Sequence, residues 1–283
     1  MTPDTFAEYI YTNELETDRF ARMLNDPTQC YKFYWLDAIM VLFPGTVDDL
    51  SFNDVFDEMI CSAWYSVTTY HLHLGPLVNG NYVNLLERAV CIIEKDTELT
   101  KPATKQDILS AIKRNEKELY ECKRDLAKNV PYRLLSSFMD EICGNDRIWD
   151  HKKRLIEYIT ELNKSVRLPY TVVDGRSLQK KIHIDLRWKE FLLDNYSVIR
   201  GWIRLNKVRF LQDRNPGVPG IIYKLDDNHE EGRKLEEVRK LWKEASKVSG
   251  KPIIDIYTGN DLAHNKFALD HFVPWSYIAN DEL

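Results

Sequence analysis

The sequence predicts a mainly α-helical protein, with a multi-helix N-terminal region and a small β-hairpin near the C-terminus. Apolar residues recur at spacings of three and four along several segments, and residues that cap or break helices bound those segments. After Pro252 the chain changes to the β-branched, apolar run 253–259, which is typical of a strand. With 283 residues, 44% of them hydrophobic, the chain is long enough to bury a sizeable core.

The first helices are bounded by clear caps and breaks. Residues 31–43 are aromatic and apolar and stop at a Pro-Gly pair, so we expect a buried helix there. Ser51, with an acid at Asp54, is a good N-cap for a helix over residues 52–73. A further helix is predicted over residues 82–94.

Two more helices complete the N-terminal part. Thr104 followed by Asp107 predicts the start of a long, charged helix over residues 105–128, whose apolar stripe is thin. Another helix is predicted over residues 150–163. We therefore expect a helical domain over residues 1–165.

A short strand is predicted next. Residues 181–186 alternate between apolar and polar side chains, as a strand with one buried face does. His183 and Asp185 share the polar face and could form a catalytic pair. Neighbours of this kind are common on a strand edge, however, and no third group is evident in the sequence.

An aromatic helix is predicted over residues 187–211, within a helical and locally basic region that we take as 166–250. Arg200, Arg204 and Lys207 are four and three residues apart, so they share one face of that helix. Such a face fits a phosphate backbone, and it fits an ordinary solvated surface equally well. The net charge of −5 argues against a general polyanion binder, but residues 178–215 carry nine Lys and Arg against four acids, so any nucleic acid is expected to bind toward this C-terminal half.

The strongest break in the chain is Asn215-Pro-Gly-Val-Pro-Gly220, with two prolines and two glycines in six residues. We expect a hinge or a rigid turn there. A last helix is predicted over residues 230–248, with an inward apolar stripe formed by Leu235, Val238, Leu241, Trp242 and Ala245.

Composition argues against several classes of protein. No run approaches the roughly 18 apolar residues of a membrane span, and the first twenty residues are acidic where a signal peptide is basic and then apolar. We expect a cytoplasmic protein with no membrane partner. The five cysteines include no Cys-x-x-Cys pair, so neither a disulfide framework nor a zinc ribbon is predicted.

The C-terminal hairpin is predicted to pair residues 253–259 with residues 267–269, and the second run leads directly into Asp270 and His271. An imidazole titrates near neutrality and suits a general base, whereas a carboxylate suits Mg²⁺ or Mn²⁺, which prefer oxygen ligands. In a regular strand these two side chains point to opposite faces. They can serve one site only if the chain bends, which Pro274 makes possible.

The string Leu269-Asp-His-Phe-Val-Pro-Trp-Ser276 resembles the first half of the HNH nuclease motif, the ββα-metal finger. The resemblance implies an endonuclease of bacterial or phage origin that hydrolyses DNA phosphodiester bonds with Mg²⁺ or Mn²⁺. It also implies that Asp270 holds the metal and that His271 activates water. Many members carry a zinc-binding Cys-x-x-Cys pair where this chain has Tyr257-Thr-Gly259, so no zinc site is expected.

The resemblance is partial. In the family a second strand and a helix follow, and that helix supplies an Asn and usually a further His or Asn, whereas this sequence stops at Leu283 without a match to either. We therefore expect residues 251–283 to be a truncated finger, and the chain to cleave slowly or not at all. The competing hypothesis is a non-catalytic helical protein that binds nucleic acid or protein and retains a relic of the motif.

Overall fold

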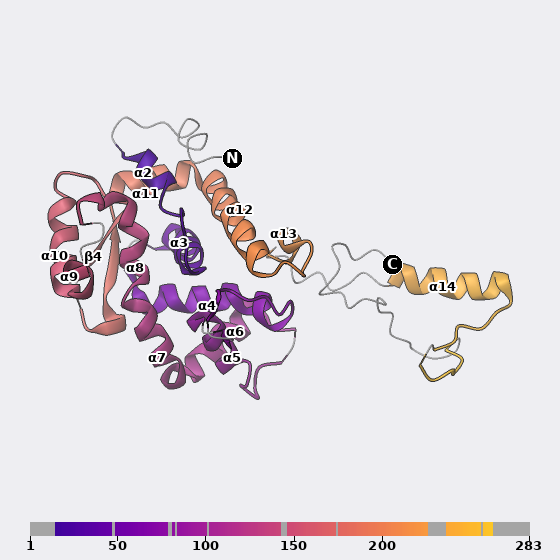
Figure 1. Ribbon diagram of the computed structural model, residues 1–283. Helices are drawn as coiled ribbons and strands as arrows, with labels where there is room; N and C mark the ends of the chain where they lie inside the picture. The colour runs from indigo at the N-terminus through magenta and orange to yellow at the C-terminus, as the bar shows by residue number, and fades with distance from the viewer. Residues whose placement is uncertain are drawn as a thin grey trace. The chain divides into compact units, whose positions relative to one another are not determined.

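The computed structural model describes residues 15–46, 49–78, 81–82, 84–100, 102–142, 146–173, 175–225, 236–255 and 257–262. The chain divides into two compact units, Met1–Asn215 and Pro216–Leu283. The division falls inside the predicted break at residues 215–220. The fold is mainly helical with a small antiparallel sheet, which confirms the predicted class (Figure 1).

The first unit is built around helix α3 (Tyr31–Leu42), which α4 (Phe52–Thr68), α8 (Val130–Arg133) and α12 (Tyr196–Arg214) surround (Figure 1). Eight consecutive residues of α3, from Phe33 to Met40, are buried. A helix with apolar side chains on nearly all of its faces has to lie inside the protein, which explains its central place, and Asp37 is the one charged side chain among these eight residues. The short helix α2 (Thr17–Ala21) contributes Phe20 to the same core.

Caps fix where several helices begin. The Ser51 hydroxyl accepts the Asp54 N–H at the start of α4, as predicted. Thr104 and Asp107 form a reciprocal capping box at the start of α6 (Lys105–Arg114), also as predicted. The predicted single helix over 105–128 is instead two helices that meet at Asn115.

Besides α8, the chain forms several further helical elements between residues 85 and 162. They are α5 (Leu85–Ile93), α6 (Lys105–Arg114), α7 (Glu116–Ala127), the 3-10 turns Leu134–Phe138 and Asp140–Ile142, α9 (Asp146–Asp150) and α10 (Lys152–Leu162).

The small sheet joins segments that are far apart in the sequence. Strand β5 (Lys181–Ile184) lies between β1 (Leu50–Ser51) and β4 (Tyr170–Val173), and both pairings are antiparallel. One face packs on the core, with Ile182 and Ile184 buried, while Lys181 and His183 are exposed on the other. A separate hairpin pairs β2 (Leu77–Val78) with β3 (Asn81–Tyr82).

After a 3-10 turn at Ser177–Gln179, helices α11 (Leu186–Asp194) and α12 complete the first unit. The predicted boundary between residues 165 and 166 does not separate compact units. β5 pairs with β1, and α12 packs against α3, so residues 166–215 are part of the first unit.

In the second unit the structure describes α13 (Ile221–Lys224), α14 (Glu236–Ser249) and an isolated antiparallel bridge between Ile254 and Asp261. The predicted inward stripe of the last helix does not face a core among the described residues. Leu241 is 65% exposed and Trp242 is 50% exposed.

Candidate functional site

The residues with the sharpest chemical prediction, Asp270 and His271, lie outside the described residues. The structure does describe the segment that leads toward them, and it describes the other candidates: the basic face of α12 and the histidine on the small sheet.

The chain reverses shortly before the motif, at residues 255–260. Ile253 and Leu262 are joined by a backbone hydrogen bond of 2.7 Å, and the Asp255 N–H donates to the Asn260 carbonyl at 2.9 Å. Gly259 has a φ of +71°, a left-handed conformation that glycine adopts without a steric cost. The predicted strand over 253–259 is therefore wrong beyond Ile254, because the turn occupies its second half.

Asp255 organises that turn. One carboxylate oxygen accepts the Tyr257 N–H at 2.9 Å, and the other accepts the Thr258 hydroxyl at 2.7 Å. The Thr258 hydroxyl, together with the Tyr257 N–H, holds the pKa of this carboxyl below its usual range. Both oxygens thus serve the turn. Across the described part of the chain, no group of three or more His, Cys, Asp or Glu side chains is placed to hold a metal ion.

The predicted nucleic-acid face of α12 points toward α3. Arg200 Nε lies 3.1 Å from Asp37 Oδ1, and Lys207 Nζ lies 3.5 Å from Asp37 Oδ2. Lys207 is only 7% exposed. The Arg204 Nε is also buried. The three residues share one face of the helix, as the spacing indicated.

This placement gives the face a structural role. Asp37 is buried on α3, and burying a carboxylate is costly unless cations compensate it. Lys207 also lies 4.7 Å from the centre of the Tyr34 ring, an additional cation–π contact. A phosphate could reach Lys207 only if α12 separated from α3.

His183 is paired, but with a different partner from the one considered in the sequence. Its Nδ1 lies 2.7 Å from Oδ1 of Asp49, which precedes β1, and the β4–β5 register places Thr171 opposite His183 on the other side. Asp185 instead caps α11 by accepting the Arg187 and Trp188 N–H groups. The His183 side chain is 57% exposed, so solvent screens the pair.

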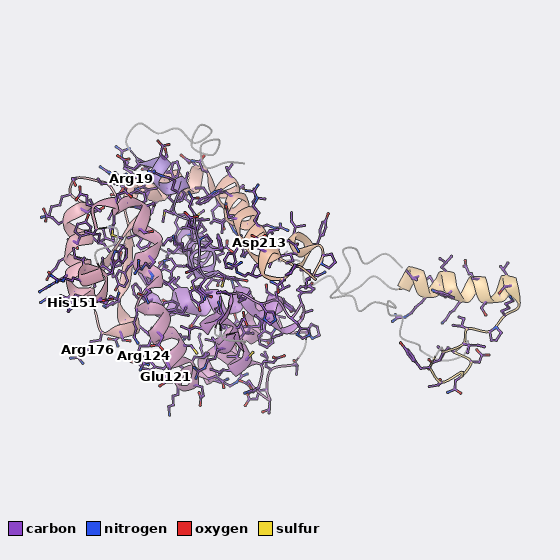
Figure 2. The ribbon with its side chains drawn as sticks, viewed as in Figure 1. Arg19, Glu121, Arg124, His151, Arg176 and Asp213 are labelled. Atoms are coloured by element: carbon purple, nitrogen blue, oxygen red, sulfur yellow. The ribbon has the colours of Figure 1, made fainter. Side chains whose placement is uncertain are left out.

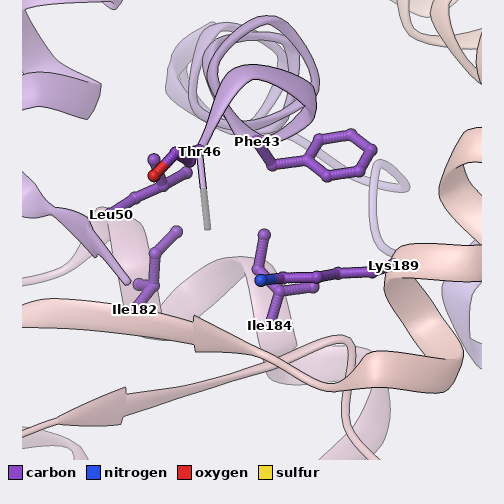
Figure 3. Close-up of a pocket in the computed structure, with 6 residues that line it drawn as sticks. All are labelled: Phe43, Thr46, Leu50, Ile182, Ile184 and Lys189. Carbon is purple, nitrogen blue, oxygen red and sulfur yellow. The ribbon is translucent and has the colours of Figure 1, made fainter. Parts of the chain in front are cut away.

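A shallow hollow lies on the opposite side of β5, where Phe43, Thr46, Leu50, Ile182, Ile184 and Lys189 line it (Figure 3). Its volume of about 170 Å³ includes space open to solvent, and it leaves no room for a water-sized molecule. Ligand pockets are typically roughly 300–1,000 Å³ and enclosed. The hollow is therefore a packing gap of the sheet.

A buried ion cluster that the sequence analysis missed joins α4 to α7. Lys123 is fully buried, and its Nζ lies 2.5 Å from Asp57 Oδ1, 2.6 Å from Glu116 Oε2 and 3.0 Å from Asn53 Oδ1. Burial raises the pKa of Asp57 to about 6, even though Lys123 acts to lower it. The cluster is largely closed to solvent and holds two helices together, so we assign it a structural role.

Searches of known protein families, of curated proteins and of solved structures returned no match to this chain. Of the helices that the structure describes, none combines the length and the apolar composition needed to cross a bilayer.

Proposed function

We propose that this chain is an HNH-type, metal-dependent endonuclease polypeptide that hydrolyses DNA phosphodiester bonds. The observation that carries the proposal is the string of residues 269–276, which keeps an apolar residue, Asp-His, an apolar pair, Pro and Ser in the order of the motif. In support, the chain reverses at residues 255–260, shortly before that string in the sequence, which is compatible with a finger that begins with a hairpin.

Two side chains carry the proposed chemistry. His271 takes a proton from the attacking water, a role that suits an imidazole because its pKa lies near neutrality. Asp270 offers the oxygen ligand that Mg²⁺ or Mn²⁺ prefers. The cation, when bound, stabilises negative charge on the leaving 3′ oxygen.

We propose that activity is weak, because the residues that match the motif supply one carboxylate and one imidazole. A single carboxylate competes poorly with water for a divalent ion, so further ligands are needed for a tight site. The same reasoning makes a non-catalytic binding protein the competing function.

The test is long incubation of supercoiled plasmid with the full chain and Mn²⁺, followed by electrophoresis. We expect slow nicking that His271→Ala reduces by roughly 10²–10⁴-fold, the usual contribution of a general base. Asp270→Asn should abolish nicking and also weaken Mn²⁺ binding measured by the paramagnetic resonance of free Mn²⁺. His183→Ala is the matched control, because it makes the same substitution at an exposed histidine outside the motif and should leave the nicking rate unchanged.

Equal nicking rates in the wild type and His271→Ala would contradict the proposal. DNA binding without any nicking, in the wild type as in the variants, would favour the non-catalytic alternative. We also propose a cytoplasmic location, supported by the free thiols of Cys30, Cys61, Cys91 and Cys122.

A further inference from the structure

Two cations from separate elements of the first unit, Arg133 and Lys152, lie over the rings of Trp149 and Tyr132, and two more, Lys32 and Lys180, lie close enough to act on them electrostatically. Lys32 is in the first turn of α3, Arg133 ends α8, Lys152 begins α10, and Lys180 follows the 3-10 turn before β5. We call these four residues the basic patch. Figure 2 labels His151 and Arg176, near Lys152 and Lys180 in the sequence, and in that view both lie at one edge of the unit.

Aromatic rings hold two of these cations in place. The Arg133 guanidinium lies 4.2 Å from the centre of the Trp149 ring. Lys152 Nζ lies 5.5 Å from the centre of the Tyr132 ring. Lys152 also donates to the Trp149 carbonyl. Tyr132 and Trp149 are almost fully buried, so the charges rest on a rigid base.

Among the residues that the structure describes, three of the four cations have no carboxylate partner within ion-pair distance. Within the described residues, Lys32, Arg133 and Lys152 make no ion pair within 4.0 Å, whereas Lys105, Arg114 and Lys128 each do. Lys32 instead donates to the Asn25 carbonyl at 3.5 Å. Asp26 attracts Lys32, and Asp150 attracts Lys152, but both act from beyond ion-pair distance.

The cations are close enough to repel one another. Burial lowers the pKa of Lys32, opposed by Asp26, and Arg133 lowers it further. Burial also lowers the pKa of Lys152, with Arg133 and Lys180 adding to the effect. Such a cluster is unfavourable in a chain with a net charge of −5 unless an anion compensates it.

We infer that the basic patch of Lys32, Arg133, Lys152 and Lys180 binds the phosphate backbone of the nucleic-acid substrate. This inference rests on the proposed nuclease function and places substrate contact on the first unit, at residues other than Arg200, Arg204 and Lys207. Arg133 is exposed and the four cations come from four separate elements, which suits an extended polyanion better than an enclosed small anion.

A membrane surface fits the patch less well. Interfacial binding uses apolar or aromatic side chains that insert beside the cations. Here the aromatic rings beneath the cations are covered, since Trp149 is 4% and Tyr132 is 1% exposed. The patch thus offers charge and hydrogen-bond donors without an apolar anchor.

The test measures binding of a fluorescent DNA duplex of about 20 base pairs to the full chain by anisotropy, in EDTA, between about 50 and 300 mM KCl. If all four cations contact phosphate, a plot of the logarithm of the association constant against the logarithm of the KCl concentration has a slope of about −3.6. In the double variant Lys32→Gln with Lys152→Gln, the slope should be only about −1.8, and binding should be weaker by roughly 30-fold at 0.15 M salt. The control is Lys128→Gln with Lys164→Gln, because both lysines are exposed and pair with acids three residues away. It should bind as the wild type does.

Three results overturn the inference. They are undetectable DNA binding by the wild type at low salt, binding by the patch variant with the wild-type slope, and displacement of DNA by inorganic phosphate beyond its effect on ionic strength. The last result would indicate a single-anion site. None of them decides the nuclease proposal, because nicking with Mn²⁺ and its loss in His271→Ala are measured separately. Equal thermal unfolding of both double variants establishes that the patch variant is folded.

Discussion

Individual charged side chains in this protein fall into two groups that burial distinguishes. Lys123 and Lys207 are buried, and each contacts carboxylates from another helix. Lys32 and Lys152 are partly buried and contact backbone carbonyls. Burial of a charge is tolerated where an opposite charge compensates it, so the first group stabilises helix packing and the second is suited to an external anion.

The raised pKa of Asp57 predicts how the free energy of unfolding depends on pH. Its folded-state pKa of about 6 is above the ordinary value of 3.8, so the folded state binds this proton more tightly than the unfolded state does. Protonation of Asp57 should therefore stabilise the fold as the pH falls from about 6 to about 4, by roughly 2 kcal/mol. Urea unfolding of the wild type and of Asp57→Asn across that range checks it. The difference in unfolding free energy should shift in favour of the wild type at low pH, and a constant difference would contradict the assignment.

Helix boundaries are decided by short-range capping wherever a polar side chain is available. Ser51 and Thr104 were recognisable from the sequence because each is followed three residues later by an acid and then by an apolar run. The breaks at Asn115 and Asn195 were missed, since the apolar pattern continues through both. The helix predicted over 52–73 ends at Thr68, and His71 beyond it has a positive φ of 51°.

Ser51→Ala tests the cap of α4. The Asp54 N–H then loses its acceptor, and the free energy of unfolding should fall by about 1 kcal/mol. Ser51→Asp should restore most of it, because aspartate caps well. Ser110→Ala serves as the control, because Ser110 is a half-buried position inside α6 whose hydroxyl donates to the Gln106 carbonyl of its own helix, and it should change stability by less than about 0.5 kcal/mol. Denaturant unfolding followed by tryptophan fluorescence measures all three variants.

For the whole molecule, the informative residue is Asn215, the last residue of the first unit. Its Oδ1 accepts the His73 N–H at 2.8 Å, and its Nδ2 donates to the His73 carbonyl at 2.9 Å and to the Leu211 carbonyl at 2.8 Å. One buried amide therefore ties the end of α12 to the segment that follows α4. This contact fixes the C-terminal end of the first unit, at the residue before Pro216.

Asn215→Ala should lower the free energy of unfolding of the first unit by roughly 1–3 kcal/mol, because it leaves the His73 N–H and carbonyl without these partners. Gln212→Ala, one turn earlier on a half-buried position, is the neighbouring control and should cost less. If Asn215→Ala lowered the free energy of unfolding no more than Gln212→Ala does, water would be taking over the hydrogen bonds of the amide. Hydrogen exchange of residues 69–76 gives an independent measurement, and the variant should exchange faster there.

The sequence by itself determined the helical class, the main caps, the strand at residues 181–184 and the break at residue 215. All of these depend on residues within a few positions of one another, whose backbone preferences act locally. It also supplied the Asp270–His271 motif, which remains a prediction. The shared face of Arg200, Arg204 and Lys207 followed from spacing alone.

Only the tertiary structure decided which way that face points, and it points to Asp37 on α3. Tertiary structure also paired His183 with Asp49 and brought Lys32, Arg133 and Lys152 together, although 101 residues separate the first two in the numbering. Contacts of this kind arise from burial of the aromatic core, which brings distant segments together whatever their polar residues are. The spacing of charges along a chain sets which of them share a helix face, and packing sets which of them meet a partner, a solvent surface or a substrate.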